Sequence, residues 1–245
     1  MTTIISQFYN EDYMLPWWLD HHSKIFYNGI MIDYKSTDNS RKIIQEMCPT
    51  WQIIDSRNEL FSAKDCDEEV MAVESAIVGY KIALNITEFW VGNIKKLTAE
   101  NNEQYLIPCV PMIDSIADEY EEPTDDPLIP QRLNGIDFTR GESFFDMRKA
   151  RSLHRTDVVY STGRHFKKWS THDCWILWYG YSPFTEQIIN RKLQIQNKIP
   201  EADKINQLGR EHLIDRDQLL INFRNMQQHA QDLTSYIMPL YGDTF

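Results

Sequence analysis

Short apolar runs alternate with helix-forming segments through the first 93 residues, and this alternation is the strongest constraint on the fold. The strand-like runs occupy residues 2–8, 29–33, 51–54 and the stretch that begins at Tyr80. Between them, apolar side chains recur at helical spacing after polar capping residues. Strands that alternate with helices predict a parallel sheet covered by helices, with right-handed crossovers. We therefore expect an α/β fold with an open, mainly parallel sheet.

The second half of the chain is less regular and predicts a mixture of strands and helices. Two prolines within residues 105–113 favour an edge strand, because proline cannot donate a ladder hydrogen bond. The other elements expected here are a hairpin over 134–145 that turns at Arg140 and Gly141, strands at 157–160 and 174–179, a helix capped by Ser182 with Pro183 at its first position, and a long polar helix over 215–236.

Composition limits the classes of function. The net charge of −11 argues against a protein that follows a nucleic-acid backbone, because such proteins carry basic stripes. A pocket for one small anion needs only a few local cations and is compatible with this charge. The chain has no GxGxxG, GxxxxGK[ST] or GxSxG pattern, which argues against dinucleotide-binding, P-loop and serine-hydrolase enzymes.

Cysteine usage and hydropathy predict a cytoplasmic protein. The four cysteines lie far apart, without a CxxC pair or a histidine at metal-binding spacing, as in proteins whose thiols stay reduced. No apolar run has the length of a transmembrane segment, and the N-terminus has no basic region followed by an apolar one.

The stretch over residues 80–92 carries the first functional signal. Its apolar run ends in the polar side chains of Asn85, Thr87 and Glu88. In an open α/β sheet, ligands lie outside the carboxyl ends of the strands. This stretch is therefore either the floor of a ligand site or a buried strand followed by an ordinary turn.

Three motifs in the correct strand order resemble family 2 glycosyltransferases, which have the GT-A fold. Residues 32–40 (IDYKSTDNS) resemble the VDDGSTDNS turn after that family's second strand, residues 5–11 (ISQFYNE) resemble its first strand and NE turn, and residues 84–89 (LNITEF) resemble the LDIDEF form of its DxD strand. Residues 178–182 (WYGYS), followed by Arg191 and Lys192, are similar to the HYxxRS…K segment of a related subgroup.

The resemblance implies a single GT-A-like domain over residues 1–245. Its parts would be a nucleotide-binding half at 1–93, an acceptor and catalytic half at 94–210, and a C-terminal helix at 211–245.

The resemblance also assigns roles in a donor site. Asp33 would supply the carboxylate that a nucleotide-sugar donor needs for its base or ribose. Lys64 stands where the family's arginine often follows the third strand, with Arg57 as a second cation for the diphosphate and Arg164 as a third. A solvated lysine at a helix start is the alternative interpretation of Lys64. The floor of the donor site would consist of Asn85, Thr87 and Glu88.

Metal binding is the point at which this chain departs from the family. Where the family places two aspartates, this chain has Asn85 and Thr87, and only Glu88 keeps a charge. Mg²⁺ and Mn²⁺ are hard cations that favour carboxylate oxygens. A site built on Glu88, with His165 as a further contact to the metal or the diphosphate, would hold either ion weakly. The requirement for Mn²⁺ or Mg²⁺ therefore stays open. A basic side chain beside the diphosphate could supply the positive charge instead of the metal ion.

Inverting transfer requires a base that takes the proton of the acceptor hydroxyl. By the resemblance, this is an acid well beyond the DxD strand, with Asp173 as the first choice and Glu186 as the second. His172 is an alternative base. For each of the three, a polar loop residue or a helix cap is the alternative interpretation. Aromatic residues nearby would form a platform for a sugar acceptor, namely Trp169, Trp175, Trp178, Tyr179 and Tyr181.

The sequence therefore predicts a cytoplasmic glycosyltransferase that moves a sugar from a nucleotide-sugar donor to a glycan or other hydroxyl acceptor, with inversion. One alternative is a catalytically silent nucleotide- or glycan-binding protein on the same fold, with the degraded acidic motif as its signature. A small-molecule α/β enzyme unrelated to sugars is the third hypothesis. Nucleic acid is not expected as a partner.

Overall fold

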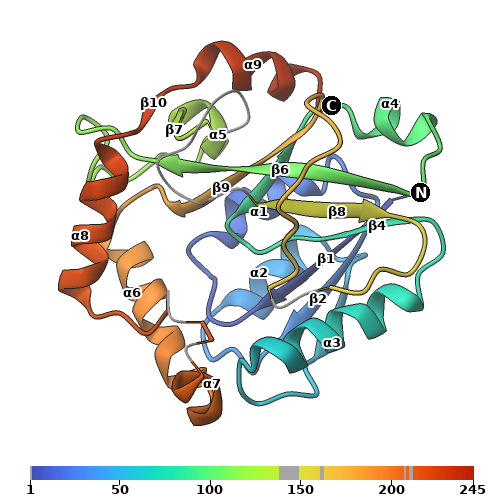
Figure 1. Ribbon diagram of the computed structural model, residues 1–245, viewed down its shortest axis with the longest axis horizontal. Coiled ribbons are helices and arrows are strands. Elements are labelled where there is room, and N and C mark those ends of the chain that lie inside the picture. Colours follow the sequence, from blue (N-terminus) through green and yellow to red (C-terminus); the bar gives the residue numbers. More distant parts are fainter. Residues whose placement is uncertain (1, 138–148, 161–162, 207, 210–211) are drawn as a thin grey trace.

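The computed structural model describes residues 2–137, 149–160, 163–206, 208–209 and 212–245. Within them, ten strands form one mixed sheet with helices on both of its faces (Figure 1). The strand order begins β3-β2-β1-β4 and continues through β8 and β6, and β6 also pairs with β9. The predicted α/β fold is confirmed.

The first four strands of this order are parallel, as the alternation of the sequence predicts. They are β1 (Thr2–Phe8), β2 (Asn28–Asp33), β3 (Gln52–Asp55) and β4 (Tyr80–Ala83), and the helices between them are α1 (Leu15–His22), α2 (Ser40–Met47) and α3 (Ala63–Ser75). Their carboxyl ends meet at one edge of the sheet, called the carboxyl edge below.

Alternate side chains of each parallel strand pack against different helices. Ile4 of β1 belongs to the core cluster that contains Trp18 of α1 and Ile44 of α2. Ile5, its neighbour, belongs to the cluster that contains Val70 of α3. The helices α1 and α2 therefore cover one face of the sheet and α3 covers the other.

The second half of the sheet is mixed. β8 (Ala150–His154) lies antiparallel between β4 and β6 (Gln104–Ile113). β9 (Trp175–Tyr181) runs parallel to β6 and antiparallel to β5 (Glu88–Val91). The two-residue strands β7 (Asn134–Gly135) and β10 (Gln231–Asp232) extend the far side of β6.

The expectation that residues 105–113 form an edge strand is wrong, because β6 has neighbours on both sides. Pro108 lies opposite Ala150, whose N–H and C=O both pair with Phe166 instead. Pro108 has no backbone N–H to donate, but Ala150 needs no donor from β6 because it pairs with Phe166. The proline therefore removes no hydrogen bond between β6 and β8 at that position. Near Pro111 the register with β9 shifts before Ile113, so the second proline lies at an irregularity.

Several predicted elements of the second half need correction. Residues 157–160 are a loop, and the strand lies just before them in β8, whose polar side chains concealed it. The strand predicted at 174–179 is confirmed as β9. The part of the predicted hairpin that includes Arg140 and Gly141 lies outside the described residues.

The predicted helix starts are also shifted. α6 (Glu186–Gln194) begins four residues after Ser182, whose hydroxyl donates to Asp114 and therefore does not cap the helix. The helix predicted over 215–236 is interrupted, because β10 separates α8 (Arg216–Gln227) from α9 (Thr234–Gly242). The remaining helical segments are α4 (Ile94–Ala99), α5 (Leu128–Gln131), the short 3₁₀ turn η1 (Ile195–Lys198) and α7 (Glu201–Ile205).

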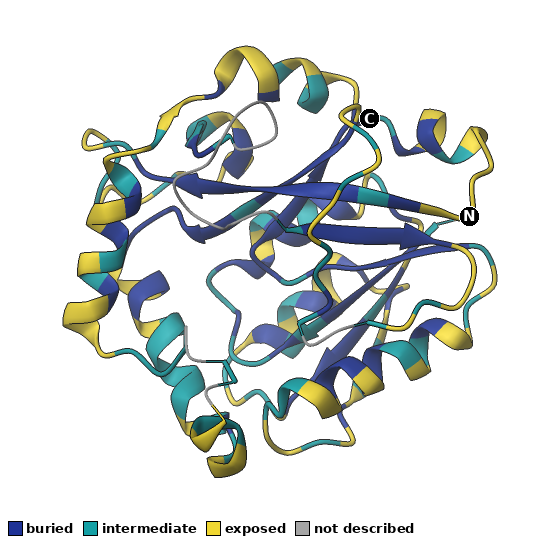
Figure 2. Ribbon diagram, in the orientation of Figure 1, coloured by how far each residue is buried: buried dark blue, intermediate teal, exposed yellow. Residues whose placement is uncertain are grey.

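Figure 2 shows the strands as the buried layer and the outer helices as the exposed one. No helix among the described residues combines the length and the apolar character needed to cross a membrane.

A buried polar cluster lies between α3 and the sheet. Glu74 of α3 accepts a hydrogen bond of 2.9 Å from the Tyr160 hydroxyl, and its other oxygen lies 3.7 Å from His154 Nε2. Burial raises the pKa of Glu74 to about 7, against the opposing effects of Tyr160, Arg164 and Lys81. Burial lowers the pKa of His154 to about 4. Both groups are therefore held in their neutral forms near pH 6.

This cluster predicts a pH-dependent difference between Glu74→Gln and the unsubstituted protein. The raised pKa of Glu74 contributes stability that is complete below its unfolded pKa of 4.5 and is lost as the pH rises through about 7. Glutamine has no such titration. Between pH 5 and pH 8 the variant should therefore gain up to about 3 kcal/mol relative to the unsubstituted protein, at about 1.4 kcal/mol per pKa unit.

Urea unfolding at both pH values measures this gain. His154 titrates in the opposite sense in both proteins and therefore cancels in the comparison. Glu68→Gln, at an exposed position on the same helix, is the matched control and should show no pH-dependent difference. A constant difference between Glu74→Gln and the unsubstituted protein from pH 5 to pH 8 would contradict the prediction.

Candidate functional site

Polar side chains from separate parts of the chain meet at the carboxyl edge, on the face covered by α3. The guanidinium of Arg164 donates to Gln7 Oε1 at the end of β1 (2.8 Å) and to Asn85 Oδ1 just beyond β4 (3.3 Å). It also pairs with Asp67 of α3 at 3.3 Å. The backbone N–H of Gly163 donates to the same carboxylate at 2.7 Å, which fixes the loop that carries Arg164. The structure therefore brings Asn85 and Arg164 together.

Glu88 is engaged in a buried ion pair. Its carboxylate receives hydrogen bonds from Arg151 Nε and Nη2, the latter at 2.7 Å. Glu88 is 2% exposed and Arg151 is 1% exposed. The backbone N–H and the side-chain amide of Asn85 donate to the same carboxylate. Thr87, also buried, accepts a hydrogen bond from Tyr179 N through its carbonyl.

These residues do not fit a Mg²⁺ or Mn²⁺ site. The oxygens of Glu88 already accept from Arg151 and Asn85, so a metal would have to displace a bound guanidinium. Within the described residues, no group of three or more His, Cys, Asp or Glu side chains is arranged to hold a metal ion.

His165 lies in a strongly cationic environment. Its pKa is lowered far below the usual value, first by burial and then by Arg151, Lys149 and Arg164. Three positive charges therefore act on one neutral imidazole. Two of these cations have buried carboxylate partners, since Arg151 is paired with Glu88 and Arg164 with Asp67.

The other predicted donor residues lie apart from this cluster. Asp33 ends β2 on the face of α2, where it accepts from Ser36 N and pairs with Arg41 at 2.7 Å. Lys64 forms an exposed ion pair with Glu68, four residues along the same helix. Arg57 is exposed, and its backbone N–H donates to Glu69.

Glu69 organises a buried network that sequence reasoning missed. Its carboxylate accepts from the hydroxyls of Tyr34 (2.6 Å) and Ser56 (2.8 Å) and from Arg57 N (2.7 Å). The Tyr34 ring stacks on Phe61 with 4.5 Å between centroids. The network ties the loops after β2 and β3 to α3. A detectable signal was the position of Glu69 within the apolar stripe of this helix.

A second unpredicted feature is the segment of α6 and η1, which reaches across to the loop after β1. Arg191 forms a two-point ion pair with Glu11, and Gln194 donates to the Asn10 carbonyl at 3.1 Å. The carbonyl of Lys198 accepts from Phe61 N at 2.8 Å. Figure 1 shows these helices at the end of the sheet opposite α4. This segment therefore borders the carboxyl edge.

The structure does not bring Asp173 and His172 to the carboxyl edge. Both line a hollow of about 120 Å³ with Asn93 and Lys96 at α4 and Asp243 near the C-terminus. Figure 1 shows α4 near the amino end of β1. Asp173 and His172 therefore lie away from the carboxyl edge, beside α4. A base must lie within hydrogen-bond reach of the reacting hydroxyl.

Glu186 lies on the same side of the molecule as the carboxyl edge, but its side chain is exposed to solvent. It pairs with Arg216 of α8 at 2.5 Å, and this hydrogen bond lowers its pKa. A carboxylate that the sequence did not indicate, Asp114, follows β6 and is buried. It accepts from the Ser182 hydroxyl and from Phe184 N, and burial raises its pKa to about 6.

The predicted aromatic residues divide between core and surface. Trp175 and Tyr179 are buried in the main core, whereas Trp178 is half-buried beside Tyr181. Trp169 lies next to His172. A larger hollow of about 430 Å³ lies between the start of β1 and α4, away from the carboxyl edge.

Comparisons with known proteins reveal similarity in fold only. No protein-family model and no curated protein matches the sequence. Solved structures match part of the chain at low identity and low TM-score. The match to residues 1–349 of S. aureus TarS has a TM-score of 0.37 and 10% identity, and covers 63% of this chain and 46% of that one.

A second match is glucosyl-3-phosphoglycerate synthase from Mycobacterium tuberculosis, in complex with Mn²⁺, UDP-glucose and phosphoglyceric acid. The TM-score is 0.37 with 10% identity, and the match covers 63% of this chain and 57% of the synthase. A mycobacterial protein matches with a TM-score of 0.40, 12% identity, 67% coverage of this chain and 57% coverage of its own. The chain thus spans about half the length of these structures. At this level of similarity, their ligands and activities do not transfer to it.

The buried pair of Glu88 and Arg151 predicts a large loss of stability in Arg151→Met. That variant leaves the Glu88 carboxylate buried without its cation, and breaking a buried pair in this way costs about 3–5 kcal/mol. The double variant Glu88→Gln/Arg151→Met removes both charges and should lose less. Urea unfolding of both proteins measures the difference.

Arg155→Met provides the control, because Arg155 is exposed and its side chain donates to Asn101 at the surface. It should change the free energy of unfolding by less than about 1 kcal/mol, as surface substitutions generally do. A similar small change in Arg151→Met would show that the pair is not a constraint on the fold.

Proposed function

We propose that this protein binds a nucleotide-sugar donor at the carboxyl edge and transfers the sugar to a glycan or other hydroxyl acceptor. The observation that carries the proposal is the meeting of two arginines beside Asn85: Arg151 donates to the Arg164 carbonyl, and the Arg164 guanidinium donates to Asn85. Arg151 is paired with Glu88 and Arg164 with Asp67, and Lys149 adds a further positive charge. A diphosphate is the part of such a donor that these cations would bind.

Arg164 is the residue that we assign to the diphosphate. Its guanidinium is held at the ends of β1 and β4 by Gln7 and Asn85, so its position is fixed before a ligand binds. Arginine binds phosphate oxygens through charge-assisted hydrogen bonds. In this proposal Arg164 supplies the charge that a metal would otherwise supply, and the chemistry does not depend on Mn²⁺ or Mg²⁺.

Transfer with inversion would need a base beside the acceptor. We infer that it comes from the connection between β6, β9 and α6, where Asp114 accepts a hydrogen bond from Phe184 N and Glu186 follows Phe184 by two residues. The pKa of Asp114, about 6, lies closer to neutrality than that of an ordinary aspartate, which suits a base. Glu186 would have to leave Arg216 to act.

The second candidate is a nucleotide- or glycan-binding protein without catalysis. It is favoured by the state of the carboxylates at the carboxyl edge, because Glu88, Asp67 and Glu11 are all paired with arginines. Such a protein would bind the donor but neither transfer nor slowly hydrolyse it. Incubation with nucleotide-sugars, followed by detection of free nucleoside diphosphate, separates the two candidates.

Thermal unfolding with UDP, GDP or TDP tests the donor site. A ligand at 100 times its Kd adds about 2.7 kcal/mol of stability, so one of the three should raise the Tm by several degrees. The shift should persist in EDTA, because the proposed site uses no metal. Arg164→Gln should abolish it, whereas Arg57→Gln, at an exposed position, should keep it.

Failure of all three diphosphates to raise the Tm, with or without Mn²⁺, would contradict the proposal. A shift that requires Mn²⁺ would preserve donor binding but contradict the role given to Arg164. Asp33→Ala is a poor test, because it would also release Ser36 and Arg41 from their contacts.

A further inference from the structure

We propose that Trp178, Tyr181, Lys149 and Lys192 form a subsite for an anionic sugar, one that carries a phosphate or a carboxylate. The inference rests on the proposed function, in which this sugar would be the acceptor or its terminal residue. It names the chemical class of the acceptor, which neither the sequence motifs nor the donor site defines.

The geometry combines two ammonium groups with two aromatic rings. Lys192 Nζ lies 4.1 Å from the centroid of the Tyr181 ring and 5.6 Å from that of Trp178. Lys149 Nζ lies 5.8 Å from the Trp178 centroid. The two rings meet edge to face, with 5.8 Å between centroids and 87° between planes. One indole therefore has two cations beside it.

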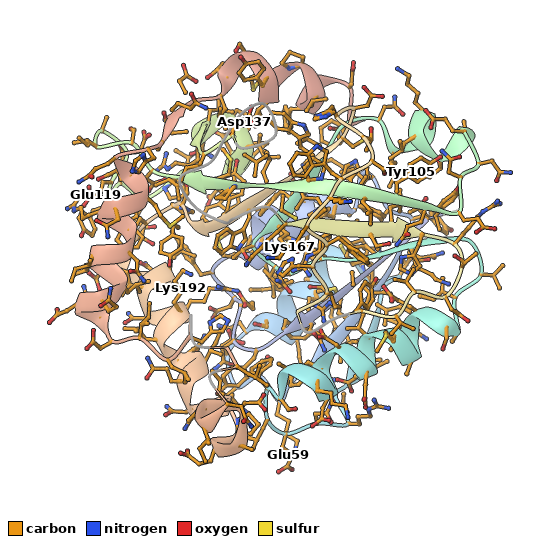
Figure 3. All side chains as sticks on the ribbon, in the orientation of Figure 1. Glu59, Tyr105, Glu119, Asp137, Lys167 and Lys192 are labelled. Atoms are coloured by element: carbon orange, nitrogen blue, oxygen red, sulfur yellow. The ribbon has the colours of Figure 1, made fainter. Side chains whose placement is uncertain are left out.

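The sequence around Trp178 allows this arrangement. A Cβ at Gly180 would lie only 2.3 Å from atoms of the Trp178 ring, so the indole packs flat against a backbone that only glycine provides. The rest of the Trp178 side chain stays half-buried, whereas its neighbours Leu177 and Tyr179 are fully buried. Lys192 reaches it from α6, and Figure 3 labels this lysine on that helix.

The subsite adjoins the proposed donor site. Trp178 of β9 is the direct partner of Glu88 in the antiparallel pairing with β5. Lys149 directly precedes β8 and is two residues from Arg151, the partner of Glu88. Arg151 in turn donates to the carbonyl of Arg164. A continuous set of contacts therefore leads from the diphosphate-binding arginine to the indole, as transfer between two bound sugars requires.

The charges explain why the sugar should be anionic. The protein carries a net charge of −11, so an anion is repelled by the surface as a whole and needs a local cationic site. An aromatic ring offers a face to the C–H groups of a sugar, and two ammonium groups beside it offer charge-assisted hydrogen bonds to a phosphate or carboxylate.

Calorimetric titration of the full chain tests the subsite with glucose 6-phosphate, glucuronate, glucose and inorganic phosphate. At least one of the two charged sugars should bind tenfold or more tightly than glucose and than phosphate alone. Lys192→Gln and Lys149→Gln should each weaken that binding by about tenfold, the effect of one charge-assisted contact. Lys192→Arg should restore most of it.

Lys95→Gln is the matched control, since Lys95 is exposed on α4 at the other end of the sheet. Trp178→Phe should weaken the charged sugar but not inorganic phosphate. If Trp178→Phe does not fold, the Lys192 variants still test the subsite. The preference between glucose 6-phosphate and glucuronate identifies the source of the charge.

The proposal is overturned if neither charged sugar binds more tightly than glucose, or if Lys192→Gln behaves like Lys95→Gln. It is also overturned if phosphate alone binds as tightly as the sugar phosphate. UDP binding should be unchanged in Lys192→Gln and lost in Arg164→Gln. Binding of a charged sugar that depends on Lys192, without binding of any nucleoside diphosphate, would support the subsite and overturn the proposed donor site.

Discussion

The buried ion pair of Glu88 and Arg151 is the interaction on which the carboxyl edge depends. It joins the start of β5 to β8 through two residues that are 63 positions apart in sequence. Two charges taken out of water need nearly all of their hydrogen bonds satisfied. Arg151 meets this need with the carbonyls of Gly163 and Arg164 as well as with Glu88. The pair thereby positions Arg164 too.

This pair also determines the electrostatic character of the site. If the acidic residue after β4 were free, the carboxyl edge would attract a divalent cation. Because its charge is cancelled by Arg151, Glu88 is not available to a metal ion, and Lys149 adds a positive charge beside the pairs Glu88–Arg151 and Asp67–Arg164. The degenerate acidic motif and the buried arginine are therefore two parts of one arrangement. Both the proposed diphosphate contact and the proposed anionic-sugar subsite follow from it.

The parallel half of the fold could be predicted because its signals are local. The strands β1 to β4 are short apolar runs, and the helices between them have apolar residues at helical spacing, with Ser62 as the cap of α3. The second half escaped prediction where tertiary contacts override local preference. β6 tolerates two prolines because Phe166 takes the bonds of Ala150, and β8 is a strand although Arg151, Ser152 and His154 are polar. Its polar side chains are buried only because partners reach them from distant segments.

The sequence by itself determined the α/β class and the position of the carboxyl edge, with Asn85 as a candidate for it, because strand order places polar turn residues where parallel strands end. Only the tertiary structure decided which charges cancel. It paired Glu88 with Arg151, Asp33 with Arg41 and Asp67 with Arg164, and it placed Asp173 beside α4. Charge pairing depends on distances of a few ångströms between residues far apart in the chain, and no local pattern encodes those distances.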